Sequence, residues 1–245
     1  MYNLGLIGYP LSHSFSKKYF DLKFHQEKIK NFSYKLFDIG SLSQLNHIID
    51  THNLIGFNVT SPYKEAILPH IHKLDKIAKN TNSVNTVFIK KNEKIGFNTD
   101  FFGFNKLLYS IDNIKSSKAL ILGSGGTCQT IKYCLNKENI KYKVVSRKPT
   151  IHMIKYQEIK KYINEYKIII NTTPLGQYPN IEYYPDIPYE LLSPEHYCID
   201  LIYNPTKTIF LQKSELKGAC ILNGYDMLTE QAKSSWKIWL NLIHS

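Results

Sequence analysis

The chain contains a single arginine, Arg147, although lysine and arginine together number 31. This arginine lies in "VVSRK", between Ser146 and Lys148, with no acidic residue beside it. A guanidinium is planar and can bind two oxygens of one phosphate, which a lysine ammonium cannot do. The position of Arg147 therefore indicates phosphate binding, and a solvated loop residue is the plain alternative.

A glycine-rich turn precedes this arginine by about 20 residues, the spacing of a dinucleotide-binding unit. In "ALILGSGGTC" an apolar strand runs into Gly123, Gly125 and Gly126, just before a helical pattern. In such a unit the first glycine permits the turn and the second lets the backbone approach a pyrophosphate, which the amides at the helix start then face. Cys128 takes the usual third glycine position and is small. Because Arg147 replaces the acid that would accept from a ribose 2′-hydroxyl, the pattern favours NADP over NAD.

Lys64 and Asp100 are the candidates for proton transfer. "NVTSPYKEA" predicts a helix with Ser61 at the N-cap and Pro62 at the first helical position, so that Lys64 is the third helical residue. A cation there opposes the helix dipole, which makes the position unfavourable for stability and suited to acid-base chemistry; a solvent-facing lysine is the plain alternative. Asp100 begins the next helix, where the dipole favours a carboxylate and capping is the usual role.

Further polar side chains follow the carboxyl ends of predicted strands. Open α/β sheets bind ligands outside those ends, so we expect these side chains to converge. Their hydroxyl, amide, ammonium and carboxylate groups would line a site for a small polyhydroxylated acid. The set consists of Ser14, Ser16, Thr60, Lys64, Asn85 and Asp100.

The apolar pattern of the first hundred residues predicts an α/β unit. Short apolar stretches at 4–8, 34–39 and 55–60 alternate with helical patterns at 15–28 and 41–52. This βαβαβ order favours a mainly parallel sheet.

The rest of the chain predicts a second α/β unit in tandem. Residues 85–98 form two strands joined near Lys91 and Asn92, and a helix then runs from Thr99 or Asp100 to about residue 111. The strand of the glycine turn, a helix, "YKVVSR", another helix, "KIIINTTP" and "YCIDLIY" follow in order. The last stretch, "DMLTEQAKSSWKIWLNLI", has helical spacing and is expected to pack back on the first unit. The predicted domains are 1–100, completed by 223–245, and 101–222.

Composition narrows the class of protein. With 245 residues and 43% hydrophobic content, the chain suits one large or two modest globular domains. It has no secretory signal pattern, and no apolar run approaches the ~20 residues of a membrane span, so we expect a cytoplasmic protein without a membrane partner. The net charge of +11 is spread along the chain without interleaved aromatic residues, which favours an anionic small molecule over nucleic acid.

The cysteines and histidines do not indicate a metal site. No CxxC pair occurs, and "PHIH" at residues 69–72 lacks cysteine or carboxylate company. We therefore expect surface histidines there and reduced, buried thiols rather than disulfides. The cysteines are Cys128, Cys134, Cys198 and Cys220.

Taken together, the motifs resemble the shikimate dehydrogenase family over nearly the whole chain. They include "GYPLSHSFS", "GFNVTSPYK", "SVNTV", "GFNTD", "ILGSGGT", "VVSRK", "INTTPLG", "DLIYNPTKT" and "NGYDMLTEQA", in the family's order. The resemblance implies an N-terminal substrate domain and a Rossmann-type NADP domain. It also implies reversible, NADPH-dependent reduction of 3-dehydroshikimate to shikimate, a step of aromatic amino-acid biosynthesis. Lys17 stands where proline is common in the family, and "SRK" replaces the commoner "NRT".

The resemblance also implies roles for individual residues. Lys64 and Asp100 form the catalytic pair. Substrate binding is implied for Ser14, Ser16, Thr60, Asn85, Asp100, Tyr203 and Gln231. NADP binding is implied for Gly123, Ser124, Gly125, Gly126, Thr127, Ser146, Arg147, Lys148, Leu201 and Gly224.

Two alternatives stay open. The first keeps the fold and the cofactor but takes quinate or a related cyclohexene acid. The second is a nucleotide-sensing or nucleic-acid-binding protein without catalysis. Lys64 and Asp100 argue against the second, and Ser16 favours shikimate because quinate users often carry threonine there. Both a monomer and a homodimer fit the sequence.

Overall fold

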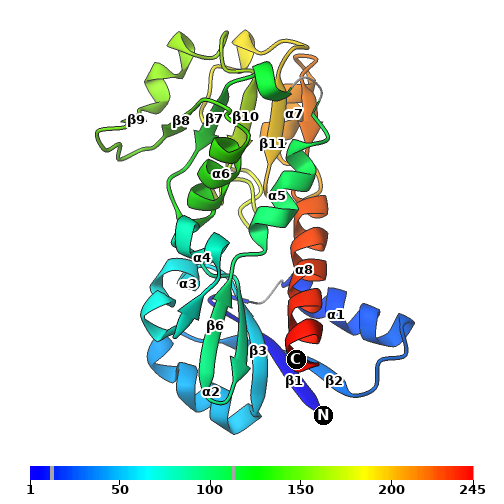
Figure 1. Cartoon of the computed structure of the whole chain (residues 1–245). Helices are drawn as coiled ribbons and strands as arrows, with labels where there is room; N and C mark the ends of the chain where they lie inside the picture. The colour runs from blue at the N-terminus through cyan, green and yellow to red at the C-terminus, as the bar shows by residue number, and fades with distance from the viewer. Residues whose placement is uncertain (12–13, 112–113, 245) are drawn as a thin grey trace. The chain divides into compact units, whose positions relative to one another are not determined.

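The computed structural model describes residues 1–11, 14–111 and 114–244 (Figure 1). Its contacts divide the chain into a first unit, residues 1–99 with 231–245, and a second unit, residues 100–230. The second boundary lies further along the chain than the predicted position at 223. Residues 223–230 belong to the second unit because Gly224 is tied there, its N–H donating to the carbonyl of Ile202 at 3.1 Å.

Over its described residues, the first unit has a six-stranded sheet in the order β2-β1-β3-β5-β6-β4. Neighbouring strands β2, β1 and β3 are parallel, as predicted, and β5 and β6 form an antiparallel hairpin. The strands are β1 (Tyr2–Gly8), β2 (Phe32–Asp38), β3 (Leu54–Val59), β4 (Lys73–Leu74), β5 (Thr86–Lys90) and β6 (Glu93–Phe97). The helices are α1 (Phe15–Gln26), η1 (Leu42–Gln44), α2 (Leu45–His52), α3 (Tyr63–Ala66), η2 (Leu68–His70) and α4 (Lys76–Thr81).

Both faces of this sheet are covered, which explains why β1 is almost continuously apolar. Leu6 belongs to a buried cluster with Phe20 of α1 and Trp239 of the last helix, α8 (Tyr225–Ile243). Ile7 points to the opposite face and belongs to a second cluster with Leu45 of α2. The prediction that the C-terminal helix packs on the first domain is confirmed, since the Trp239 indole N–H donates to the carbonyl of Val87 at 2.9 Å.

The turn between β5 and β6 lies where the sequence predicted it. Lys91 and Asn92 both have positive φ, 50° and 64°, and Lys90 pairs with Glu93. A two-residue hairpin turn with both central residues in the left-handed region matches the right-handed twist of the flanking strands. Asparagine tolerates this conformation better than most residues do.

The second unit has a six-stranded sheet over its described residues, in the order β12-β11-β10-β7-β8-β9, with every neighbouring pair parallel. Counted along the chain from β7, this is the 3-2-1-4-5-6 order of a Rossmann fold, as predicted. The strands are β7 (Ala119–Leu122), β8 (Tyr142–Val145), β9 (Met153–Ile154), β10 (Ile168–Asn171), β11 (Tyr197–Asp200) and β12 (Cys220–Leu222). The helices are α5 (Asp100–Leu108), η3 (Ile114–Ser116), α6 (Gly126–Lys137), η4 (Tyr156–Lys161), η5 (Tyr189–Leu191), α7 (Ile209–Glu215) and the first part of α8.

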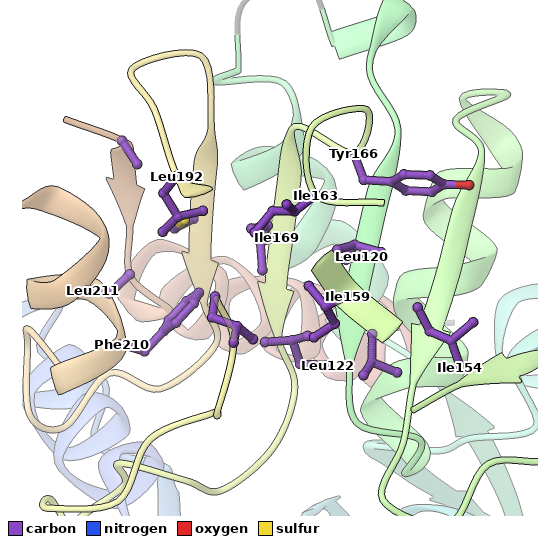
Figure 2. Packing of buried hydrophobic residues seen from close by; sticks show 14 residues of the cluster. Leu120, Leu122, Ile154, Ile159, Ile163, Tyr166, Ile169, Leu192, Phe210 and Leu211 are labelled. Carbon is purple, nitrogen blue, oxygen red and sulfur yellow. The ribbon is translucent and has the colours of Figure 1, made fainter. Parts of the chain in front are cut away.

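The helix predicted between "YKVVSR" and "KIIINTTP" is present only as the short 3₁₀ helix η4, and it follows a strand that was not predicted. The chain turns back after β8 and forms β9, where the N–H of Ser146 donates to the carbonyl of Ile154 at 3.0 Å. In the segment between β9 and β10, only the short 3₁₀ helix η4 then packs on the sheet. Figure 2 shows Ile159 of this helix with Leu120 and Leu122 of β7 in one buried cluster.

None of the four cysteines forms a disulfide bond, and all lie within the described ranges. Burial raises the pKa of Cys198 to about 12, so this thiol stays protonated at neutral pH. Cys128 and Cys134 are also buried, as expected. Cys220 is exposed, contrary to the expectation, because it begins β12 at the edge of the sheet.

No metal site or membrane span is found in the parts of the chain that the structure describes. There, no cluster of three or more His, Cys, Asp or Glu side chains could hold a metal ion. Similarly, the described helices include none with both the length and the apolar character that crossing a bilayer requires. His72 is exposed, and its Nδ1 accepts from the N–H of Lys94 at 3.0 Å.

Replacing Trp239 with alanine should destabilise the protein by about 3 to 5 kcal/mol, because a fully buried side chain and its hydrogen bond to Val87 are both lost. Denaturant unfolding of the full chain measures this change. Lys237→Ala, at an exposed position of the same helix, is the matched control and should change the free energy of unfolding by less than about 0.5 kcal/mol. An equal effect of both substitutions would contradict the packing of α8 described above.

Candidate active site

The first unit has a switch point between β1 and β3, where the chain connections leave the sheet in different directions. β2 lies on one side of β1, and β3 lies on the other. The N–H of Thr60, just after β3, donates to the carbonyl of Ile7 in β1 at 2.9 Å, so the two strand ends are adjacent. Open α/β sheets bind ligands in the crevice at such a point. Four of the predicted site residues follow these two strands: Ser14, Ser16, Thr60 and Lys64.

Ser14 occupies the N-cap position of α1, but its hydroxyl serves another purpose. Its N–H donates to the carbonyl of Leu11 at 3.1 Å, while Leu11 is held by the Asp38 carboxylate at 3.0 Å. Among the residues that the structure describes, no group bonds to the buried Ser14 Oγ, and this oxygen does not cap the helix. Because a buried hydroxyl without a partner is costly, Ser14 Oγ fits a role in binding an oxygen of a ligand.

Lys64 lies in a single helical turn, α3, and the predicted cap of that helix is wrong. The carbonyl of Thr60 accepts from the N–H of Tyr63 at 3.0 Å, and this turn puts Pro62, instead of Ser61, at the N-cap. Lys64 is therefore the second helical residue and not the third. A helix of four residues has a small dipole, so the dipole supports a catalytic lysine less than the sequence suggested.

The Asn85 side chain is buried and joins two distant parts of the sequence. Its Oδ1 accepts from the N–H of Thr99 at 2.7 Å and from the Thr99 hydroxyl at 3.1 Å. Its Nδ2 donates to Gln231 Oε1 of α8 at 3.4 Å. The structure thus brings together Asn85 and Gln231, which are 146 positions apart in the chain.

Ser16 is buried in α1 and is hydrogen-bonded to the phenol of Tyr34. The Tyr34 hydroxyl in turn donates to Asn58 Oδ1 at 2.8 Å. Burial raises the pKa of Tyr34 far above its ordinary value, and the hydrogen bond from Ser16 opposes only part of that shift. Tyr34 therefore stays neutral and can hold the Ser16 side chain in place.

Sequence reasoning missed the polar residues that support these side chains. They lie inside stretches interpreted only as apolar strands or as a helix, and one signal was available, namely polar residues at positions that the pattern marks as buried. These supporting residues are Tyr34, Asn58, Thr86, Thr99 and Ser235.

Two features of the second unit fit a dinucleotide's pyrophosphate at the end of β7. Gly123 has φ +106°, and a Cβ there would lie 2.7 Å from Thr172 Oγ1, so only glycine suits this turn. Gly125 is the N-cap of α6, and a Cβ on it would meet nothing within 4 Å. The backbone of Gly125 is therefore open to a ligand at the start of a helix, where N–H groups favour an anion.

Ser146 is buried at the end of β8 and links this turn to the arginine. Its Oγ accepts from the N–H of Lys148 at 3.2 Å and lies 3.4 Å from Ser124 Oγ. Arg147 and Lys148 are both exposed. The structure thus presents two cations beside the glycine turn, at the position where a 2′-phosphate is expected.

Leu201 and Gly224, both of which the resemblance assigns to NADP, lie in contact. A Cβ on Gly224 would lie 2.2 Å from the carbonyl oxygen of Leu201, so no other residue fits there. Tyr203 follows two positions after Leu201 and is half-buried. Asp100 begins α5 in the second unit, one peptide bond after Thr99, and is 5% exposed.

Asp200, which sequence reasoning also missed, anchors the segment that contains Leu201 and Tyr203. Its carboxylate is fully buried and accepts from Asn171 Nδ2 and from the N–H of Ile202, both at 3.1 Å. The Thr208 hydroxyl donates to the other oxygen at 2.5 Å. Burial raises the pKa of Asp200 from 3.8 to about 6, although these three hydrogen bonds act in the opposite direction.

Comparison with known proteins relates the chain to one family. A family model described as the shikimate dehydrogenase substrate binding domain matches residues 6–87. The chain is 35% identical to the shikimate dehydrogenase (NADP(+)) of Methanococcus vannielii over 258 residues, which cover 96% of this chain and 90% of that protein. The solved structure of shikimate dehydrogenase from Aquifex aeolicus superposes with a TM-score of 0.88 and 30% identity over 98% of this chain and 92% of that one. The solved structure of the Thermus thermophilus enzyme in complex with NADP(H) and shikimate superposes with a TM-score of 0.82 and 26% identity, over 98% of this chain and 93% of that one.

The raised pKa of Asp200 predicts a pH dependence of stability. The folded state holds a proton that the unfolded state releases between about pH 4 and pH 6, so this stabilisation is complete below pH 4 and lost as the pH rises through about 6. The unfolding free energy of the wild type minus that of Asp200→Asn should fall by roughly 2 to 3 kcal/mol from pH 4 to pH 7. Denaturant titrations at four pH values measure this difference. Asp186→Asn, at an exposed position of the same unit, is the control, and its difference from the wild type should not change with pH. The prediction would be refuted if the difference between the wild type and Asp200→Asn were equally independent of pH.

Proposed function

This chain belongs to the shikimate dehydrogenase family, and we propose that Lys64 and Asp100 are its catalytic pair. The chain is an NADP-dependent oxidoreductase that reversibly reduces 3-dehydroshikimate to shikimate, a reaction of aromatic amino-acid biosynthesis. The observation that carries the residue assignment is the buried Ser14 hydroxyl at the β1–β3 switch point, a polar atom unmatched among the described residues. This hydroxyl supports substrate binding at the ends of β1 and β3, and Lys64 lies just after the end of β3.

In the proposed reaction, Lys64 acts as a general acid. When bound, NADPH supplies a hydride to the carbonyl carbon of 3-dehydroshikimate. The Lys64 ammonium donates a proton to the carbonyl oxygen, so that the C=O group becomes CH–OH and the lysine becomes a neutral amine. Asp100 orients the ammonium and accepts from the neighbouring substrate hydroxyl. In the reverse direction the amine of Lys64 removes the hydroxyl proton.

We propose that neutral groups bind the rest of the substrate. The Ser14 hydroxyl and the Tyr203 phenol donate to the carboxylate of the substrate, and the Ser16 hydroxyl, whose proton is directed to the Tyr34 oxygen in the structure, turns to donate to the same carboxylate when the substrate is bound. Hydrogen bonds to a charged acceptor are worth about 1.5 to 3 kcal/mol each, so three of them can hold an anion without an arginine. Thr60, Asn85 and Gln231 bind its hydroxyl groups, and the Asn85–Gln231 contact supports this assignment.

The cofactor assignment follows the second unit residue by residue. The backbone from Gly123 to Thr127 would hold the pyrophosphate, and Ser146, Arg147 and Lys148 would hold the 2′-phosphate. Leu201 and Gly224 would lie against the nicotinamide end. We also propose that the protein acts in the cytoplasm as a monomer or homodimer and does not bind nucleic acid.

Replacing Lys64 with alanine should lower turnover by ~10² to 10⁴-fold while KM changes far less, because the general acid is lost and most binding groups remain. Asp100→Asn should also lower turnover. The assay follows NADPH absorbance with 3-dehydroshikimate, and 3-dehydroquinate and NADH serve as controls for specificity. Lys79→Ala, at an exposed position of the same unit, should leave both constants unchanged.

Retained turnover in Lys64→Ala would reject the role of this residue as the acid. A change in KM alone for Asp100→Asn would make Asp100 a binding residue. Faster turnover of 3-dehydroquinate than of 3-dehydroshikimate by the wild type would reject the substrate.

Replacing Arg147 with alanine should weaken NADP binding by about 2 kcal/mol and leave NAD nearly unchanged, because only NADP has the 2′-phosphate. Arg147→Lys should recover part of the affinity, since an ammonium lacks the planar fork, and alanine at both Arg147 and Lys148 should remove most of what remains. Arg147→Asp should favour NAD. The measurement is kcat/KM with both cofactors. Equal losses for NADP and NAD would mean that Arg147 has a structural role.

A further inference from the structure

Three buried hydroxyl groups from separate elements meet in the first unit. They belong to Thr86 of β5, to Thr99 before α5 and to Ser235 of α8, and each residue is fully buried. The Oγ atom of Ser235 lies 2.7 Å from that of Thr86 and 3.1 Å from that of Thr99, and the two threonine oxygens are 3.2 Å apart. We call Thr86, Thr99 and Ser235 the hydroxyl cluster.

The Asn58 amide of β3 contacts the hydroxyl cluster with a fixed orientation. Its Nδ2 donates to the backbone carbonyl of Asn85 at 3.1 Å, and a carbonyl can only accept, so this end of the amide must be the nitrogen. The same nitrogen lies 3.0 Å from both Thr86 Oγ1 and Ser235 Oγ. The hydroxyl cluster therefore has to accept the second N–H of Asn58, which Thr86 Oγ1 and Ser235 Oγ share.

The direction of each hydrogen bond in the cluster follows from counting protons, since a hydroxyl has only one. Ser235 donates its proton to the carbonyl of Gln231, one turn earlier in α8, at 2.9 Å. Ser235 Oγ is then an acceptor toward Asn58 and Thr86. The Thr86 hydroxyl lies nearer to Ser235 Oγ, at 2.7 Å, than to Asn85 Oδ1, at 3.2 Å, so its proton is directed to Ser235. The Thr99 hydroxyl donates to Asn85 Oδ1 at 3.1 Å.

This arrangement sets the polarity of two amides that we assign to the substrate. Asn85 Oδ1 accepts from the Thr99 N–H, so a flipped Asn85 would put an NH₂ group against a donor. With the oxygen directed inward, Asn85 Nδ2 donates to Gln231 Oε1, and the NH₂ is the end of Gln231 that can donate outward. The pair can therefore offer N–H groups, which suit the lone pairs of ring hydroxyl oxygens.

We propose that Ser235 is a positioning residue for substrate binding. Its hydroxyl completes the cluster that keeps Asn85 and Gln231 turned as hydrogen-bond donors toward the substrate. This role rests on the proposed function, because it assumes that the two amides bind 3-dehydroshikimate. Ser235 itself touches neither substrate nor cofactor, and it influences substrate binding through Thr86, Thr99 and Asn58.

The test is Ser235→Ala, with Ser234→Ala as its matched control one position earlier on α8, where the side chain is only half-buried. Ser235→Ala should raise KM for 3-dehydroshikimate about ten-fold, the equivalent of one hydrogen bond of about 1.4 kcal/mol. The turnover number and KM for NADPH should each stay within about three-fold. Ser234→Ala should leave all three constants unchanged.

Two variants of Thr86, in β5, test the contact between Thr86 Oγ1 and Ser235 Oγ from its other side. Thr86→Val has the same shape without the hydroxyl and should raise KM for 3-dehydroshikimate as Ser235→Ala does, whereas Thr86→Ser keeps the hydroxyl and should restore KM close to the wild-type value. An unchanged KM in Ser235→Ala and Thr86→Val would overturn the positioning role. Equal changes in KM for 3-dehydroshikimate and in KM for NADPH would also overturn it, because the cluster would then be purely structural. The loss of a cooperative melting transition in both Ser235→Ala and Thr86→Val would have the same meaning. Absence of turnover in the wild type would instead reject the proposed reaction.

Discussion

The hydrogen bond from the backbone N–H of Thr99 to Asn85 Oδ1 is the interaction on which the polar side of the first unit depends. A backbone N–H can only donate, so it requires the oxygen end of the Asn85 amide to face inward, and the Thr99 hydroxyl of the hydroxyl cluster donates to the same oxygen. The same bond also holds the chain at the last residue before α5. Asp100, the first residue of α5, is the next residue of the chain.

Asp200 has the corresponding role in the second unit. Its buried carboxylate accepts from Asn171 at the end of β10, and from the N–H of Ile202 and the hydroxyl of Thr208 in the loop after β11. Burying a carboxylate is costly, and the raised pKa expresses that cost. In both units a buried polar side chain at a strand end therefore organises the loops, while apolar residues hold the sheet itself.

Much of this architecture could be predicted from local patterns. The parallel strands β1, β2 and β3, the turn at Lys91 and Asn92, and the glycine turn after β7 each have a signal within a few neighbouring residues. In the place of a regular helix directly after β8, the chain forms β9, which pairs with β8, and then only the short helix η4. The contact between Asn85 and Gln231 could not be derived by spacing, since it depends on α8 returning to the first sheet through Trp239. For supporting residues such as Ser235, the one local signal is a polar side chain at a position that the helical pattern marks as buried, and this signal does not identify the partners of the side chain.

The two units differ in the kind of group that they offer to a ligand, and burial explains the difference. Ser16, Asn85 and Gln231 are all nearly inaccessible to water, and an unpaired cation at such positions would cost several kcal/mol in desolvation. Neutral hydroxyls and amides with fixed partners avoid that cost and still donate to an anion. Arg147 and Lys148 are exposed, so they keep their hydration until a phosphate replaces it. Exposed charges are screened by salt much more than buried dipoles are, so in the proposed assignment the binding of the cofactor phosphate depends on ionic strength more than the binding of the ring hydroxyls does.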